Sequence, residues 1–343
     1  MQNKLNSKLI GAGALLLTAF IWGTSFVSQV AGMDALSPFA FNAVRFTFGA
    51  VSLLPVVLLR RGSARTFDLK KTLKYGLLCG CLLFCASSLQ QYGVLYGMNA
   101  GRAGFITGLY IILVPLLGIL IGKRARAMSF VAAVVSLSGL YLLCFAGSES
   151  AGFGIGDVLL LGGAVFFAIH ILVVERIGTQ IDPMHLSILQ ISTVAALSWV
   201  CTPFTGGLSF GAIGAVIWPI LYSGVASTGI AYTLQIFGQN RMEAAPASII
   251  MSLESFFSVV GGAVALHETM SVQAYIGCGL MLAGTILAQI PGRKRPGEDF
   301  PSTDLQSASS NDSRSNDSHS NDSRGEAHDD QDSSSSLSSR AAS

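Results

Sequence analysis

Ten apolar segments, each long enough to cross a lipid bilayer, constrain the fold of this chain more than any other feature. A spanning helix needs about 20 mostly apolar residues, because each residue rises about 1.5 Å through about 30 Å of hydrocarbon. Backbone groups left unpaired in lipid are costly, and the sequence lacks strands of alternating polarity. We therefore predict an all-α membrane protein with ten transmembrane helices. The segments are Leu9–Val30, Pro38–Leu59, Leu73–Tyr96, Ala103–Gly122, Met128–Phe145, Asp157–Val174, Pro183–Thr202, Ala215–Phe237, Ala244–Leu266 and Val272–Ile290.

The low content of charged residues also indicates that lipid surrounds the chain. Hydrophobic residues make up 51% of the 343 residues and charged residues only 12%, about half the share of a soluble domain. So few charges cannot cover a soluble exterior, so we expect the lipid bilayer to surround the chain. The net charge of +2 is close to neutral and indicates no nucleic-acid partner.

The loops between the segments predict the orientation. If the N-terminus is cytoplasmic, the inner side receives sixteen Lys and Arg residues, whereas the outer side receives only Arg102. Cytoplasmic loops of membrane proteins carry this excess of positive charge. We therefore predict an N-in/C-in topology.

The segments form two related halves at a shift of 144–145 residues. Gln91 corresponds to Gln235, Gly139 corresponds to Gly284, and a proline opens the second segment of each half. We expect a first repeat over 1–150 and a second over 151–290. Because five is an odd number of helices, the second repeat must insert upside down, and folds with such inverted-topology repeats place the substrate site between the halves.

The last part of the chain, 291–343, differs in composition. It is rich in Ser, Asn and Asp and contains three copies of a five-residue repeat, Ser-Asn-Asp-Ser followed by Arg or His. Such a segment buries too little apolar area to order itself, so we expect a disordered cytoplasmic tail.

Several short motifs occur along the chain between roughly Lys8 and Ile290. They are Trp22-Gly23-Thr24-Ser25-Phe26, Ser37-Pro38 with Arg45-Phe46, Ala103-Gly104-Phe105-Ile106-Thr107-Gly108-Leu109 with Val114-Pro115-Leu116, Ser252-Leu253-Glu254, and Leu266-His267-Glu268. Together they resemble the EamA-type, ten-helix branch of the drug/metabolite transporter superfamily. The resemblance implies a secondary carrier of the cell inner membrane, often an exporter of amino acids or related metabolites.

Ionisable side chains at lipid depth are expensive and are therefore the first candidates for the site. Glu254, near the middle of its segment, could bind a cationic amine or exchange a proton, or it could be a structural carboxylate. Arg45 could bind a substrate carboxylate, or it could extend its charge toward the membrane surface. His170 could carry a proton, or it could be a hydrogen-bonded histidine of the core.

Other polar and aromatic residues are candidates for lining a cavity. Gln91 and Gln235 could orient a substrate or hydrogen-bond neighbouring helices. Trp22 and Tyr110 could contact an amphipathic ligand or serve in packing. We expect a small-molecule substrate, coupling to protons is one option, and the sequence leaves the oligomeric state open.

The sequence indicates neither an enzyme nor a bound cofactor. The stretch from Gly118 to Arg124 resembles a phosphate loop but lacks one spacer residue and the Ser or Thr after lysine. The six cysteines all lie in apolar runs and are typical of small apolar filler, not of a metal site. Besides a carrier, a channel and a membrane scaffold or sensor that acts through its tail stay open. Deleting Pro296–Ser343 would abolish the function of a sensor but not that of a carrier.

Overall fold

The described part of the chain is helical throughout. The computed structural model describes residues 2–59, 68–96, 100–123, 127–145, 154–177, 180–208, 210–266 and 271–289, and these residues include no β-strand. They belong to one compact unit, which spans Met1–Gly292. The tail predicted for 291–343 lies outside the described residues.

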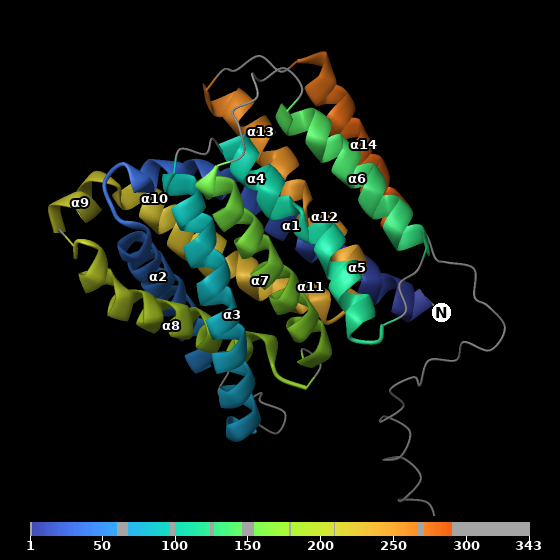
Figure 1. Cartoon of the computed structure of the whole chain (residues 1–343). Helices are drawn as coiled ribbons and strands as arrows, with labels where there is room; N and C mark the ends of the chain where they lie inside the picture. The colour runs from blue at the N-terminus through green and yellow to red at the C-terminus, as the bar shows by residue number, and fades with distance from the viewer. Residues whose placement is uncertain are drawn as a thin grey trace, which may run out of the picture. The chain divides into compact units, whose positions relative to one another are not determined.

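The helices follow one another along the chain with short connections (Figure 1). In the first half they are α1 (Gln2–Met33), α2 (Pro38–Leu59), α3 (Leu69–Leu95), α4 (Ala100–Gly108), α5 (Tyr110–Leu120) and α6 (Ala127–Phe145). In the second half they are α7 (Ile155–Ile177), α8 (Pro183–Cys201), η1 (Thr202–Thr205), α9 (Phe210–Ala215), α10 (Ile217–Leu221), η2 (Tyr222–Ala231), α11 (Tyr232–Gln239), α12 (Ala244–Met251), α13 (Leu253–Leu266) and α14 (Val272–Gln289).

All ten predicted segments coincide with helices, and the class of all-α membrane protein is confirmed. Among the described residues, six helical stretches are long and apolar enough to cross a bilayer, including α1, α2, α3, α7 and α8. The sixth combines α10, η2 and α11. The other four predicted segments fall on shorter apolar helices of 10–17 residues.

Two of the predicted segments are interrupted at nearly equivalent places. The first interruption lies at Leu109, between α4 and α5, and the second at Ser252, between α12 and α13. At a shift of 144 residues Leu109 corresponds to Leu253, so the two interruptions are one position apart. Tight i to i+3 bonds occur at both, from the Ile112 N–H to the Leu109 carbonyl (3.0 Å) and from the Ser255 N–H to the Ser252 carbonyl (3.2 Å).

Serine hydroxyls account in part for the second interruption. Ser248 and Ser252 each donate a side-chain hydrogen bond to a backbone carbonyl three residues earlier, both at 2.8 Å. Such bonds compete with regular helix hydrogen bonding and favour a bend. The interruption positions Glu254, which lies two residues further along the chain.

Helices from the two halves of the sequence pack mainly against each other. Helix α1 packs on α11, η2 and α13, α3 packs on α7 and α8, and α2 packs on α8 and η2. Helices α6 and α14 lie side by side in Figure 1 and form an extensive contact. The hydrophobic core is therefore built between the halves.

Two of these helix contacts are equivalent by the sequence repeat. Gly93 of α3 packs against Leu160 and the carbonyl of Gly156 in α7, whereas Gly238 of α11 packs against Leu15 and the carbonyl of Gly11 in α1. Each member of the second contact is 145 residues from its counterpart in the first. The repeat seen in the sequence is thus also a repeat of packing.

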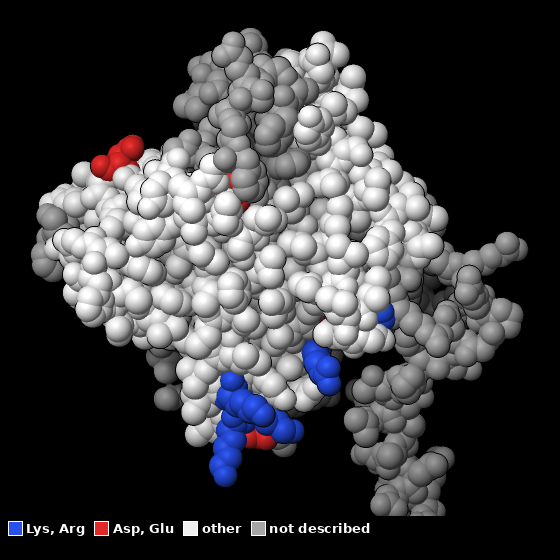
Figure 2. Space-filling view, in the orientation of Figure 1, with Lys and Arg blue, Asp and Glu red and all other residues white. Residues whose placement is uncertain are grey.

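Positive charge gathers at one end of the helices. In Figure 2 the blue side chains lie at the lower end of the view, near the beginning of α3 and the ends of α5 and α7. The residues there are Lys70, Lys71 and Lys74 in α3, Lys123 after α5, and Arg176 in α7. Of the sixteen cations assigned to the inner side, those at 60, 61, 65, 124, 126 and 293–295 lie outside the described residues.

Replacing Gly238 tests the close packing of α1 on α11. A Cβ at this position would lie 2.6 Å from Cγ of Leu15 and 2.9 Å from the carbonyl oxygen of Gly11. We expect Gly238→Ala to lower the free energy of unfolding by about 1–3 kcal/mol, because the helices must move apart. The measurement is thermal unfolding in detergent, followed by size-exclusion chromatography with fluorescence detection.

Gly13 supplies the matched control in the same protein. A Cβ there meets no heavy atom within 4 Å, so Gly13→Ala should leave the melting temperature unchanged or raise it slightly. Equal melting temperatures for the two variants would contradict the packing of α1 on α11.

Candidate functional site

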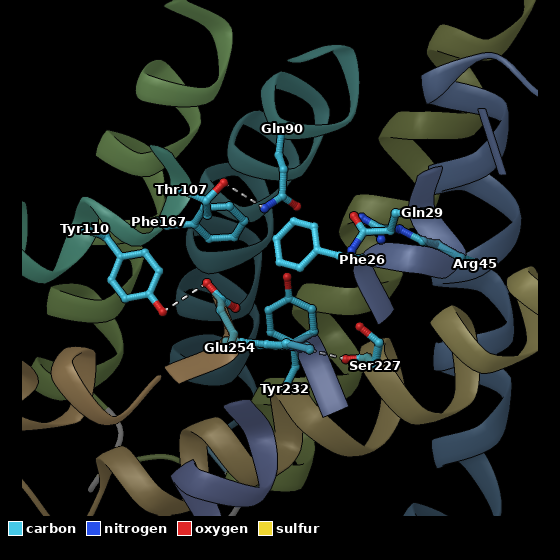
Figure 3. Close-up of a pocket in the computed structure, with 11 residues that line it drawn as sticks. Phe26, Gln29, Arg45, Gln90, Thr107, Tyr110, Phe167, Ser227, Tyr232 and Glu254 are labelled. Atoms are coloured by element: carbon cyan, nitrogen blue, oxygen red, sulfur yellow. Dashed lines mark hydrogen bonds between the residues drawn. The ribbon is translucent and has the colours of Figure 1, made fainter. Parts of the chain in front are cut away.

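A small cavity lined by both aromatic and polar side chains lies between helices of both halves (Figure 3). Its volume is about 30 Å³, enough for one or two water molecules. In this conformation it is therefore narrower than a metabolite. Its walls are formed by Trp22, Phe26, Gln29, Arg45, Gln90, Thr107, Tyr110, Phe167, Ser227, Tyr232 and Glu254.

Glu254 lies at the start of α13, immediately after the second helix interruption, and is only 4% exposed. Its carboxylate accepts a hydrogen bond of 3.1 Å from the hydroxyl of Tyr110, which is the first residue of α5. The two residues are 144 positions apart and therefore occupy equivalent places in the two repeats. Both helix interruptions thus deliver a polar side chain to the same point.

The close approach of α1 to α13 depends on Gly23. A Cβ at this position would overlap the carbonyl oxygen of Glu254 and the Cβ of Phe257. Glycine lets the two backbones meet and brings Trp22, the neighbour of Gly23, to the cavity wall beside Glu254.

Arg45 of α2 lies on the cavity wall and is only 4% exposed. Its guanidinium carbon is 5.4 Å from the ring centroid of Phe41 and 5.0 Å from that of Phe46, distances that fit cation–π contact. Its Nε is buried and has no hydrogen-bond partner among the described residues. Aromatic rings therefore support the charge, and no carboxylate in the described part of the chain pairs with it.

A hydrogen-bonded group on α1 and η2 forms one wall. The indole N–H of Trp22 donates to the carbonyl of Ser227 (3.1 Å), and the hydroxyl of Ser25 donates to the hydroxyl of Ser227 (3.1 Å). The Trp22 ring also contacts the ring of Tyr232, with 4.9 Å between centroids. The backbone of η2 is π-helical, a rare form that frequently occurs at functional sites, and it carries Ser227.

Gln90 and Thr107 form a second polar pair on the wall. The side-chain amide of Gln90 in α3 donates to the hydroxyl of Thr107 in α4 at 3.3 Å. Both groups keep acceptor capacity toward the cavity, because an amide oxygen and a hydroxyl each have two lone pairs. The pair offers a ligand neutral hydrogen-bonding groups.

Of the seven residues predicted for the site, four line the cavity: Trp22, Arg45, Tyr110 and Glu254. The other three do not line it. Gln91 donates to the backbone carbonyl of Gln29 at 3.3 Å, and Nε2 of His170 is 2.9 Å from the amide oxygen of Gln190. Gln235 is 2% exposed.

The sequence analysis missed several wall residues, among them Phe26, Gln29, Phe167 and Ser227. An aromatic or a serine carries no distinguishing signal in a chain with this much apolar sequence. The repeat could have found one of them, because Phe167 lies 145 residues after Trp22, itself a predicted site residue. The described residues include no group of three or more His, Cys, Asp or Glu that could hold a metal ion.

A further polar cluster joins three helices at the positively charged end. One carboxylate oxygen of Glu175 in α7 accepts a hydrogen bond from the ammonium of Lys123, which follows α5. The other accepts a 2.9 Å bond from the backbone N–H of Ala244, the first residue of α12. Glu175 thereby ties the ends of α5, α7 and α12 together.

Comparison with known proteins places the chain among transporters. The model of the EamA-like transporter family matches it twice, over residues 9–145 and 154–289. The same family model thus matches both halves of the chain. The two matches also cover most of the described residues.

Individual relatives cover most of the chain. An uncharacterized transporter of Archaeoglobus fulgidus is 30% identical over 277 residues, which are 80% of this chain and 84% of the relative. The uncharacterized transporter YwfM of Bacillus subtilis is 26% identical over 82% of this chain and 94% of its own. The threonine/homoserine exporter RhtA of Escherichia coli K12 is 27% identical over 58% of this chain and 71% of its own.

A crystal structure of another protein shares the fold. It has a TM-score of 0.69 and 22% sequence identity, and the likeness covers 83% of this chain and 96% of the other. The two family matches and the archaeal relative together assign the sequence. The chain belongs to the EamA-like transporter family.

Proposed function

We propose that the chain is a secondary active transporter that moves small metabolites across the cell inner membrane by alternating access. The observation that carries this proposal is the cavity at the two helix interruptions, where Arg45 and Glu254 are buried among residues of both halves. Transporters built from inverted repeats place their substrate site at discontinuous helices between the repeats. Ionisable groups at lipid depth mark such pathways.

The transmembrane arrangement belongs to the proposal. The ten segments cross the membrane, five in each half, so the halves have opposite orientations. The packing of Gly93 on Leu160 is equivalent to that of Gly238 on Leu15, which supports the same architecture for both halves. The lysines at the beginning of α3 and the cation after α5 lie on the cytoplasmic side in this arrangement.

Transport needs the cavity to open. At about 30 Å³ it accepts only water, so a metabolite enters after the walls have separated. The contacts of Glu175 with Lys123 and with Ala244 hold three helix ends together at the cytoplasmic side in the proposed orientation. Breaking them frees α5 and α12, whose opposite ends, at the two helix interruptions, lie next to Tyr110 and Glu254.

Export of amino acids or related compounds is the proposed activity. RhtA is a threonine/homoserine exporter, and its likeness to this chain favours export over import. Glu254 would take up either a proton or the amine of the substrate, which couples export to proton entry. A channel would show neither saturation nor counterflow.

Fusions to reporter proteins test the topology. Green fluorescent protein fused after residue 65 or after residue 289 should fluoresce, because both positions are cytoplasmic in the proposal. Alkaline phosphatase fused after Ser37 or within 97–99 should be active, because these positions face outward. Phosphatase activity after residue 65 would contradict the N-in arrangement.

Removing the charge of Glu254 tests transport and coupling. In cells that overexpress the chain, we expect the release of at least one amino acid or related compound to exceed that of cells with an empty vector. Glu254→Gln should lower this release about 10-fold or more, since a charged hydrogen bond to the substrate amine or proton is lost. Mass spectrometry of the medium measures it.

Asp34 supplies the control for charge removal away from the cavity. It is exposed and lies between α1 and α2, so Asp34→Asn should export like the unchanged protein. Full activity and an unchanged pH dependence in Glu254→Gln would remove Glu254 from the proposed role. No change in any compound with the intact chain would contradict the carrier itself.

A further inference from the structure

Two charges of opposite sign face the same buried cavity from different halves of the chain. Arg45 comes from α2 in the first half, and Glu254 comes from α13 in the second. In Figure 3 they lie on opposite sides of the cavity, with Phe26 and Tyr232 between them. They form no ion pair with each other.

Arg45 lacks the partner that a buried guanidinium requires. It is 4% exposed, its Nε has no hydrogen bond, and within the described ranges its support comes from the rings of Phe41 and Phe46. A buried charge without a counter-charge is strongly destabilising. A guanidinium binds a carboxylate through two parallel hydrogen bonds, so a carboxylate is the ligand group that satisfies it best.

Glu254 is also incompletely satisfied. It accepts one hydrogen bond, from the neutral hydroxyl of Tyr110, whereas an ionised carboxylate has about four acceptor positions. No cation of the described residues pairs with it. An ammonium group, which offers three donors and a positive charge, fits the free positions.

The two charges are close enough to serve one small molecule. Both side chains line one cavity of about 30 Å³, and in Figure 3 only the rings of Phe26 and Tyr232 lie between them. A ligand that reaches both charges must therefore be small. Its two charged groups must be opposite in sign.

The sequence repeat does not impose this polarity. The counterpart of Arg45 in the second half, 145 residues later, is Gln190, which contacts His170 and does not line the cavity. The counterpart of Glu254 in the first half is the neutral Tyr110. Each charge therefore occurs in one half alone, and the site has one positive and one negative end.

We propose that the cavity binds its substrate as a zwitterion, with the substrate carboxylate on Arg45 and the substrate ammonium on Glu254. The inference rests on the proposed transport function and specifies how that site recognises the charged groups of its substrate. Because the ligand contacts both halves, its binding offsets the burial of both charges when the halves close around it. The aromatic wall, including Phe26, moves aside to admit it.

Trp22 provides a direct reporter of binding. The chain has three tryptophans, and Trp199 and Trp218 are 41% and 78% exposed, outside the cavity. Replacing these two by phenylalanine leaves Trp22, on the cavity wall, as the single fluorophore. The purified full-length chain in this background is titrated with L-alanine, L-threonine, β-alanine and 4-aminobutyrate, which differ in size and in charge separation.

Two blocked forms of each compound isolate the two charges. The methyl ester removes the carboxylate charge, and the N-acetyl form removes the ammonium charge. We expect at least one zwitterion to change the Trp22 fluorescence saturably, and both of its blocked forms to bind about 10-fold more weakly or worse. This comparison uses the same protein throughout, so it does not depend on whether a site variant folds.

Site variants then assign each charge to its residue. Arg45→Gln should bind the acid and its methyl ester equally well, yet still prefer the free amine to the N-acetyl form. Glu254→Gln should show the reverse pattern. These preferences are ratios within one variant, so a general loss of affinity or of stability does not produce them.

Three results would overturn the inference. One is binding of the ester or the N-acetyl form within about twofold of the parent zwitterion. Another is the absence of any fluorescence change up to about 10 mM, ten times the upper end of common Michaelis constants. The third is an Arg45→Gln variant that keeps its preference for the free acid. If cells nevertheless export a compound that is not a zwitterion, the transport function stands and only the zwitterion site fails.

Discussion

A carboxylate surrounded by protein and lipid must find partners inside the chain, and the partner of Glu254 is the hydroxyl of Tyr110, 3.1 Å away. This one hydrogen bond joins the two helix interruptions and, through them, the two repeats. Its position decides where the cavity lies, because the interruptions expose polar side chains at a depth where regular helices would present apolar ones. Gly23 then brings α1 against α13, so that Trp22 reaches the same place.

The rest of the fold holds the two helix interruptions together, because the helices of one half pack against those of the other. Helices α1 and α3 use equivalent glycine contacts with α11 and α7, and α6 packs on α14. The charges on Arg45 and Glu254 break the equivalence, and they give the otherwise repeated cavity a direction.

Much of the fold could be predicted from the sequence, because lipid as solvent leaves few alternatives. The length of the apolar segments predicted where the helices lie, and the recurrence of residues such as Gly139 and Gly284 predicted the repeat. The helix interruptions were not predicted. Neither Leu109 nor Ser252 is a proline or a glycine, and the breaks depend on side-chain hydrogen bonds and on packing that only the folded chain shows.

The residues of the candidate site could likewise be predicted only in part. Arg45 and Glu254 stand out in the sequence because a charge inside an apolar segment is rare, and both line the cavity. His170 and Gln91 stand out as polar side chains inside apolar segments, but their hydrogen bonds are to Gln190 and to the backbone of Gln29. Polarity at lipid depth shows that a side chain needs a partner, and the three-dimensional contacts determine whether that partner is protein or ligand.

The proposed transport function requires the cavity to open alternately to the two sides of the membrane. The most direct measurement replaces Ser227, on the cavity wall, by cysteine in a chain whose six native cysteines have been removed. A membrane-impermeant thiol reagent is then applied to right-side-out and to inside-out vesicles. The account predicts labelling from both sides. Labelling from one side only, or from neither, would contradict alternating access.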